Sequence, residues 1–317
     1  MIVRWSLAEL PAVLRAAGVT RPFLVTSRRW EQLLDVSFAG RWLEIPSDRI
    51  EVAGDAGGLV AVGGGSAIDT AKRASSDSGL PLVSVPTTYS GAEWAPTFGI
   101  RDPGRRIVGG GGGAHLAGIV YDVDLTLGLP RAETVGTALN ALAHCAEALY
   151  ADRSERSDER ALTGARLIVD ALPLVVETPD DRAARLRLLQ GAAAAGEALA
   201  LAGLRLAHAI AQALGGTYGL PHGAMNALAL PLGLRFNAQV VPDAVARFAD
   251  AIGAPEDPAG KVEELARLGG FERLRDFGIP EDGLRGVAET AAGRFGNQRN
   301  PRPATADEIE ELLRTIY

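Results

Sequence analysis

Five polar residues, four of them at helical spacing, are the part of this sequence whose types could do chemistry. Asn140 and His144 are four residues apart, as are His208 and Gln212, and His222 follows in Leu-Pro-His-Gly. Each pair lies in a run typical of a helix, where residues i and i+4 share one face. Such a set is typical of a divalent-metal site, but the two amides stand where a cation would prefer a carboxylate or an imidazole. The pattern predicts a polar site and leaves open what it does with neutral amides.

A glycine-rich turn predicts a second site, for a dinucleotide. Gly63, Gly64 and Gly65 follow an apolar run and precede a helical one, with Ser66 placed to cap the helix. Glycines let the backbone approach a pyrophosphate, whose charge the free N–H groups and the helix dipole stabilise. An ordinary strand-to-helix turn is the alternative, since the fingerprint G-x-G-x-x-G is absent. Lys72, one of only two lysines in the chain, favours the nucleotide.

A second turn, Pro-Thr-Thr-Tyr-Ser, follows the next predicted strand, at the end of the sheet where ligands bind in open α/β folds. Its hydroxyls could hold phosphate, ribose or the nicotinamide amide, although a polar turn without a ligand is the plain alternative. The residues that we expect to bind NADH or NADPH are Gly63, Gly64, Gly65, Ser66, Asp69, Lys72, Thr87, Thr88 and Ser90.

The elements around these residues predict two domains. Residues 1–128 alternate β-type and helical runs, which indicates a parallel sheet covered by helices. Residues 129–317 repeat Ala, Leu, Glu and Arg at helical spacing, and a capping box at Thr305 to Glu308 opens the last helix. The predicted fold class is an α/β N-terminal domain with a parallel sheet plus an all-α C-terminal domain; a single doubly wound domain would need later strands. The predicted strands are 22–26, 42–45, 58–62, 82–85 and 119–121, the early helices 6–17 and 27–36, the hairpin 97–108, and the loop 109–113.

Composition narrows the class of protein. The chain has 317 residues, 47% of them hydrophobic, and its first residues carry no apolar run typical of a signal peptide. A single cysteine, Cys145, favours a reducing compartment, so we expect a cytoplasmic protein that does not bind a membrane. A net charge of −7, without clustered basic residues, argues against a nucleic-acid partner.

Several segments together resemble the iron-containing alcohol dehydrogenase superfamily, which has a dehydroquinate synthase-like fold, and most of all its maleylacetate reductase branch. The resemblance covers essentially the whole chain. The branch is indicated by the short Thr-Thr-Tyr loop, by Asn140 where metal-dependent members have aspartate, and by Asn300-Pro301-Arg302-Pro303. The segments that carry the resemblance are 63–72, 86–93, 140–150, 214–218 and 220–222.

The resemblance implies an active site in the cleft between the domains, NADH or NADPH as the hydride donor, and a homodimer. The metal-dependent pattern would fall on Asn140, His144, Gln212 and His222, of which only the two histidines bind iron or zinc well, so we expect no metal. Three features depart from the branch. It usually has a histidine where this chain has Gln212, and the segment between the strands ending near residue 45 and beginning at 58 is shorter. The loop 109–113 also replaces a stretch in which these reductases tend to carry charged residues.

A mechanism without a metal is consistent with these residues. When hydride adds to a carbon–carbon double bond conjugated to a carbonyl, the charge delocalises into an enolate that hydrogen-bond donors can stabilise. Imidazole can then return a proton. We expect His208, His144 and His222 to be catalytic. The side chains expected to bind the small-molecule substrate are Asn140, Gln212, Tyr89 and Arg106.

The expected function is therefore a metal-independent, NAD(P)H-dependent reductase resembling maleylacetate reductase, an enzyme of aromatic-compound catabolism. It would reduce the conjugated double bond of an oxo-acid such as maleylacetate to give 3-oxoadipate. Two alternatives stay open. One is an alcohol dehydrogenase or carbonyl reductase of the same superfamily, and the other is a non-redox member, a cyclase, lyase or binding protein that keeps the fold.

Overall fold

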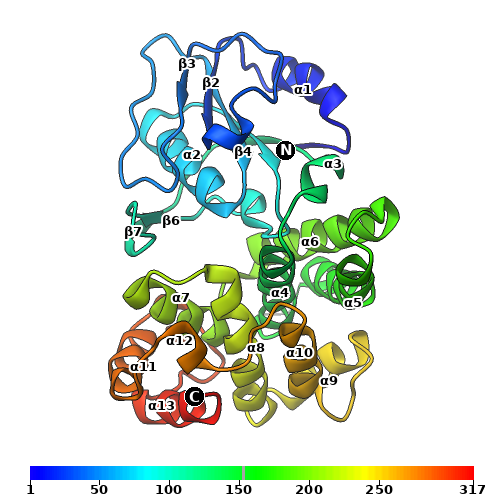
Figure 1. The fold of residues 1–317 in the computed structure, drawn as a ribbon, viewed down its shortest axis with the longest axis vertical. Coiled ribbons are helices and arrows are strands. Elements are labelled where there is room, and N and C mark those ends of the chain that lie inside the picture. The colour runs from blue at the N-terminus through cyan, green and yellow to red at the C-terminus, as the bar shows by residue number, and fades with distance from the viewer. Residues whose placement is uncertain (152–153) are drawn as a thin grey trace. The chain divides into compact units, whose positions relative to one another are not determined.

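The structure, a computed structural model, describes residues 1–151 and 154–317. They form two compact units (Figure 1). The first consists of Met1–Thr88 and Ala92–Leu129, and the second of Tyr89–Gly91 and Pro130–Tyr317. Three residues of the turn after β5 (Leu82–Pro86) thus belong to the second unit, although the strand itself belongs to the first.

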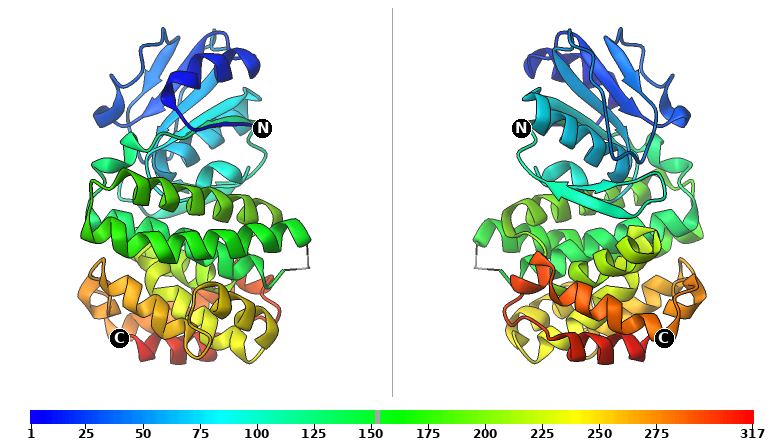
Figure 2. Two further views of the ribbon diagram at one scale, coloured as in Figure 1. Left: turned by 90° about the vertical axis from the view of Figure 1, so that its right-hand side faces the viewer. Right: turned by 90° about the vertical axis from the view of Figure 1, so that its left-hand side faces the viewer.

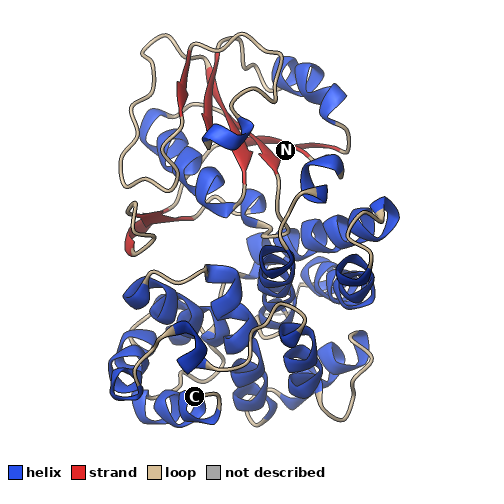
Figure 3. Cartoon of the chain, in the orientation of Figure 1, coloured by secondary structure: helices blue, strands red, loops and turns tan. Residues whose placement is uncertain are grey.

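The first unit contains a six-stranded sheet whose order is β1-β8-β5-β4-β2-β3, and every neighbouring pair is parallel. Figure 3 shows the strands of this unit in red. An antiparallel hairpin, β6–β7, lies outside the sheet. The strands are β1 (Ile2–Arg4), β2 (Pro22–Thr26), β3 (Gly40–Trp42), β4 (Gly58–Gly63), β5 (Leu82–Pro86), β6 (Phe98–Arg101), β7 (Ile107–Gly111) and β8 (Leu116–Val120).

Both faces of the sheet are buried because each strand has apolar side chains on both of its faces. One set packs with α1 (Leu10–Ala16), and the other packs with α2 (Gly65–Ser78). This explains the continuous apolar runs of the sequence, which are typical of parallel strands buried on two sides. The α1 set includes Leu24, Val60, Val62, Val83 and Val85, and the α2 set includes Phe23, Val25, Leu59, Ala61 and Leu82.

The fold class is as predicted, and four local predictions differ from the structure. The helix predicted over 27–36 is wrong, because only Arg28–Trp30 forms a short 3₁₀ turn and the rest packs irregularly against the α1 side of the core. The strand predicted over 42–45 lies earlier, over Gly40–Trp42, and Ile2–Arg4 adds an edge strand that was not predicted. The glycine loop predicted over 109–113 is partly strand β7.

The last glycine of β7, Gly111, lies against an aromatic ring of the opposite strand. A Cβ atom at Gly111 would lie 2.8 Å from the ring of Phe98, which is its partner in the hairpin. The glycine therefore makes room for the aromatic side chain of the opposite strand, a use that glycine has in strands where another group approaches closely.

The second unit is helical throughout the residues described. Its longest helices, α5 and α6, pack side by side (Figure 2), and Cys145 is buried among the helices. The helices are α4 (Arg131–Ala148), α5 (Glu155–Glu177), α6 (Arg182–Ala202), α7 (Leu206–Tyr218), α8 (His222–Ala238), α9 (Pro242–Ala251), α10 (Pro258–Arg267), α11 (Leu284–Ala292), α12 (Phe295–Gln298) and α13 (Ala306–Thr315). The first unit adds a short helix, α3 (Asp124–Leu127).

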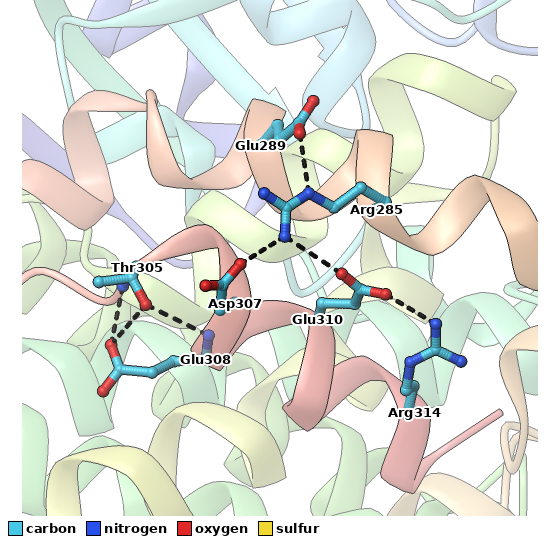
Figure 4. Close-up of polar contacts among 7 residues, drawn as sticks. All are labelled: Arg285, Glu289, Thr305, Asp307, Glu308, Glu310 and Arg314. Atoms are coloured by element: carbon cyan, nitrogen blue, oxygen red, sulfur yellow. Dashed lines mark hydrogen bonds and ion pairs between the residues drawn. The ribbon is translucent and has the colours of Figure 1, made fainter.

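The last helix begins as predicted. The hydroxyl of Thr305 accepts a hydrogen bond from the Glu308 N–H, and the Glu308 carboxylate accepts one from the Thr305 N–H. Beside this capping box, Arg285 of α11 binds Asp307 and Glu310 of α13 (Figure 4). The ion pairs are exposed, so the packing of α11 against α13 contributes more to stability than the charges do.

Within the described residues no single helix is long and apolar enough to cross a bilayer, while α6 and α7 together satisfy the criterion by length and composition but are bent by 102°.

Candidate functional site

Three histidines of the second unit lie together, each on a different helix. The rings of His144 on α4 and His208 on α7 stack with centroids 4.7 Å apart and 13° between their planes. The ring of His222, the first residue of α8, lies 6.0 Å from that of His208. We call these three residues the histidine cluster. The structure thus brings together the three side chains that the sequence indicated as catalytic.

A buried carboxylate that the sequence prediction did not include holds His208 in place. Glu147 on α4 is 1% exposed, and its Oε2 lies 2.7 Å from Nδ1 of His208. Its oxygens also accept the backbone N–H groups of His208, at 3.0 Å, and of Arg205, at 2.7 Å. Arg205 precedes the first residue of α7, so the carboxylate lies at a helix N-terminus, where the helix dipole stabilises a negative charge.

Hydrogen bonds of two amides connect a backbone carbonyl to His222. Nδ2 of Asn140 donates to the carbonyl of Ser90 at 2.9 Å, so Oδ1 of Asn140 is an acceptor, which Nδ2 of Asn226 meets at 2.8 Å. The same Nδ2 lies 3.0 Å from Nε2 of His222. Because an amide nitrogen only donates, this Nε2 is an acceptor and carries no proton. We call Ser90, Asn140, Asn226 and His222 the amide relay.

The sequence contained a signal for both missed residues. Asn226 follows His222 by four positions, and Glu147 follows His144 by three, so each lies on the helix face of a histidine that was selected. The same helical spacing, applied to His144 and His222, would have indicated both residues.

The donor atoms present do not fit a divalent cation. The rings of His144 and His222 lie next to that of His208, a residue outside the set of positions expected from the metal-dependent pattern. Oδ1 of Asn140 and Nε2 of His222 both face the N–H groups of Asn226, which a cation would have to displace. Among the residues described, no three His, Cys, Asp or Glu side chains are arranged to hold a metal ion.

The turn at the start of α2 fits an anionic ligand. Gly64, rather than Ser66, is the N-cap of α2 and carries no side chain to satisfy the free N–H groups, so the predicted cap is wrong. A Cβ atom at Gly64 would lie 2.9 Å from Cγ2 of Thr88. The hydroxyl of Thr88 is buried and has no hydrogen-bond partner among the described residues. Thr87 donates its N–H to the carbonyl of Gly63, which keeps this turn against β4.

Asp69 and Lys72, predicted to bind the cofactor, have structural contacts within the first unit. Nζ of Lys72 is buried and donates to the carbonyl of Thr97 at 2.9 Å and to Asp69 at 3.4 Å. Asp69 in turn lies 3.4 Å from a guanidinium nitrogen of Arg101 on β6. These contacts hold the β6–β7 hairpin to α2, and a role in cofactor binding stays a prediction for both residues.

The residues predicted to contact substrate lie in different surroundings. Tyr89 is fully buried in the second unit, whereas Arg106 is exposed on the hairpin of the first. Gln212 is half-buried on α7, and its backbone carbonyl accepts a hydrogen bond from Arg294 at 3.1 Å. Asn140 is the one of the four that the structure ties to the histidine cluster, through Asn226. Substrate binding by the other three stays a prediction.

Comparison with known proteins gives the family. The model described as the Fe-containing alcohol dehydrogenase family, C-terminal, matches residues 134–317, and that of iron-containing alcohol dehydrogenase matches residues 43–97. A maleylacetate reductase of Sphingobium indicum is 39% identical over 262 residues, which are 82% of this chain and 73% of the relative.

Solved structures agree with this result. A putative alcohol dehydrogenase from Ralstonia eutropha is 32% identical with a TM-score of 0.89, and a maleylacetate reductase from Agrobacterium tumefaciens is 27% identical with a TM-score of 0.86. Each comparison covers 100% of this chain and 95% of the other. The chain belongs to the iron-containing alcohol dehydrogenase family.

Proposed function

We propose that this protein is a metal-independent, NAD(P)H-dependent reductase of the maleylacetate reductase type. The substrate class is an oxo-acid with a carbon–carbon double bond conjugated to its carbonyl, such as maleylacetate, which would give 3-oxoadipate. One observation carries the proposal: the N–H groups of Asn226 face Asn140 and His222 where a catalytic cation would bind. The similarity to maleylacetate reductases supports the substrate class.

In conjugate reduction, hydrogen-bond donors can take the place of a cation. The charge that develops on the substrate spreads into an enolate, which N–H and imidazole donors can stabilise, and a proton must then be added to carbon. Within the histidine cluster, His144 and His208 offer buried imidazoles for this proton, and Glu147 offers a fixed carboxylate to stabilise the positive charge of a protonated His208.

The turn formed by Gly63, Gly64 and Thr88 would hold the pyrophosphate of NADH or NADPH, which when bound supplies the hydride. The main-chain N–H groups at the start of α2 would meet the charge, and the hydroxyl of Thr88 would gain the hydrogen-bond partner it lacks. We also propose that the protein is a homodimer, as the resemblance implies, and that it acts in the cytoplasm, as its single cysteine favours. Light scattering and cell fractionation would check these two points.

Reduction of an aldehyde or ketone is the second candidate. It is favoured by the similarity to the putative alcohol dehydrogenase and by Gln212, which stands where maleylacetate reductases usually have histidine. A ketone oxygen develops a more localised charge than an enolate does, so this reaction would depend more on a cation.

Purified protein should be assayed with maleylacetate and with simple aldehydes and ketones, following the absorbance of NADH and NADPH and identifying products by mass spectrometry. The proposal expects 3-oxoadipate to form at the same rate before and after treatment with a chelator. Faster reduction of aldehydes, or loss of activity with the chelator, would support the second candidate instead. If neither cofactor bound in a fluorescence titration, a non-redox function would follow.

A further inference from the structure

We propose that Glu147 and Asn226 are positioning residues that give His208 and His222 different tasks. Glu147 orients His208 so that its Nε2 delivers the proton to the substrate, whereas Asn226 holds Nε2 of His222 as a hydrogen-bond acceptor. This inference rests on the proposed function, since it assigns the source of the proton that the enolate needs.

Glu147 fixes both the backbone and the ring of His208. One oxygen accepts the N–H of His208 at 3.0 Å, and the other lies 2.7 Å from Nδ1 of the same residue. A third contact, from the Arg205 N–H at 2.7 Å, restrains the carboxylate itself. Because an ionised carboxylate only accepts, the proton of a neutral His208 ring is on Nδ1, and Nε2 is left to exchange a proton.

Nε2 of His208 is in a position that calls for a ligand. It is buried and has no hydrogen-bond partner among the residues that the structure describes. A buried polar atom without a partner costs about 1–3 kcal/mol, and such an atom in a native protein often has a catalytic role or an unseen partner. A substrate atom that receives a proton would be that partner.

A carboxylate and two imidazoles lie next to the His208 ring. Glu147 places a carboxylate oxygen 2.7 Å from Nδ1, His144 stacks on the ring, and the ring of His222 lies 6.0 Å away. One turn along α7 from His208, the guanidinium of Arg294 donates to the backbone carbonyl of Gln212.

His222, in contrast, is held with its Nε2 as a hydrogen-bond acceptor. Nδ2 of Asn226 donates to Nε2 of His222 at 3.0 Å. If the amide were flipped, its oxygen would face two other acceptors, Oδ1 of Asn140 at 2.8 Å and the His222 carbonyl at 3.2 Å. A proton on Nε2 of His222 would therefore meet an N–H group. His222 thus stays neutral with its proton on Nδ1 and acts through that atom.

The reaction balances with these assignments. The hydride brings two electrons to the β carbon and leaves oxidised NAD(P), and the resulting enolate takes a proton at the α carbon. As the new C–H bond forms, the Nε2–H bond of protonated His208 breaks. The neutral ring that remains keeps its Nδ1–H donated to Glu147, and solvent restores the proton in the next cycle.

The kinetic test compares three variants. Glu147→Gln should lower kcat for the oxo-acid by about 100-fold, the scale of a lost general acid, with KM changed less than about threefold. Glu147→Asp, which keeps the charge, should recover part of that loss. Glu133→Gln, at an exposed position of the same helix, is the matched control and should leave kcat unchanged. Equal kcat values for Glu147→Gln and Glu133→Gln would overturn the role of Glu147.

The second test needs no turnover, so it separates this inference from the proposed function. The chain has four histidines, and ¹⁵N spectra of labelled protein, assigned with single variants, report which ring nitrogen is protonated. We expect Nδ1 protonation for neutral His208 and His222. Asn226→Asp should move the proton of His222 to Nε2 and leave His208 unchanged. Nε2 protonation of His222 in the unmodified protein would overturn the inference, whereas these tautomers together with no turnover of oxo-acids would refute the proposed function alone.

Discussion

Arg185 donates a hydrogen bond of 3.0 Å to the hydroxyl of Tyr89, and both side chains are almost completely buried. The guanidinium also donates to the carbonyl of Pro179, and among the described residues no carboxylate lies within ion-pair distance of it. A buried charge is thus stabilised by neutral oxygens. The contact fastens the turn Tyr89–Gly91, whose Ser90 begins the amide relay, to α6 within the second unit.

Tyr89→Phe should destabilise the protein by about 1–3 kcal/mol, because it removes an acceptor from a buried charge without changing the shape of the ring. Urea unfolding measures the change. Tyr317→Phe, at the end of the chain, is the control and should stay within about 0.5 kcal/mol of the unmodified protein. An equal stability of the two variants would show that the contact with Arg185 contributes nothing.

Gly64→Ala should weaken cofactor binding by about tenfold or more, which corresponds to ~1.4 kcal/mol. The added methyl would lie 2.9 Å from Thr88, in the turn that we expect to hold the pyrophosphate, so either Thr88 or the backbone must move. Gly54→Ala has nothing within 4 Å and should bind NADH or NADPH as before. Titration of cofactor fluorescence gives both affinities, and unchanged binding by Gly64→Ala would remove this turn from the cofactor site.

Asn140→Asp should give the helical unit a binding site for zinc. The substitution supplies a carboxylate and removes the N–H that Asn140 donates to Ser90, while His144 and His222 keep their imidazoles nearby. Metal content after dialysis against zinc should rise relative to the unmodified protein. Gln239→Glu makes the same chemical change at an exposed position and is the control. If both variants retained the same zinc, the amide at position 140 would not be what excludes the cation.

The sequence predicted those parts of the molecule that depend on local pattern. The buried strands 22–26 and 58–62 and the capping box at Thr305 follow from residue types within a few positions, and the structure has them. The helix predicted over 27–36 is absent, because the packing of its apolar side chains against the sheet overrode a weak helical preference.

The candidate site was predictable to the same extent. Spacing on one helix indicated that His144 and Asn140 share a face, but it could not indicate which residues on other helices meet them. The contact of Glu147 with His208 spans 61 positions of the chain, and that of Asn226 with Asn140 spans 86. Such pairs are determined by how the helices pack, and helical periodicity within one segment does not contain that information.

A buried acid of the first unit leads to a prediction about pH. Glu93 accepts a hydrogen bond of 2.6 Å from the hydroxyl of Tyr121, which in turn accepts one of 2.7 Å from Trp94. Burial raises the pKa of the Glu93 carboxyl above its usual value of 4.5, and the bond from Tyr121 offsets this only in part. The folded protein therefore holds a proton on Glu93 at pH values where the unfolded chain has released it.

The stability of the unmodified protein relative to Glu93→Gln should consequently fall as the pH rises above 4.5. Below that value Glu93 is protonated in both states, and above it ionisation favours the unfolded chain until the folded carboxyl also ionises. Glutamine keeps the acceptor for Tyr121 and does not ionise, so the difference isolates the carboxyl. Urea unfolding of both proteins between about pH 4 and about pH 9 measures this difference. Glu51→Gln at an exposed position should show no such trend, and a difference independent of pH would mean that folding does not change the pKa of Glu93.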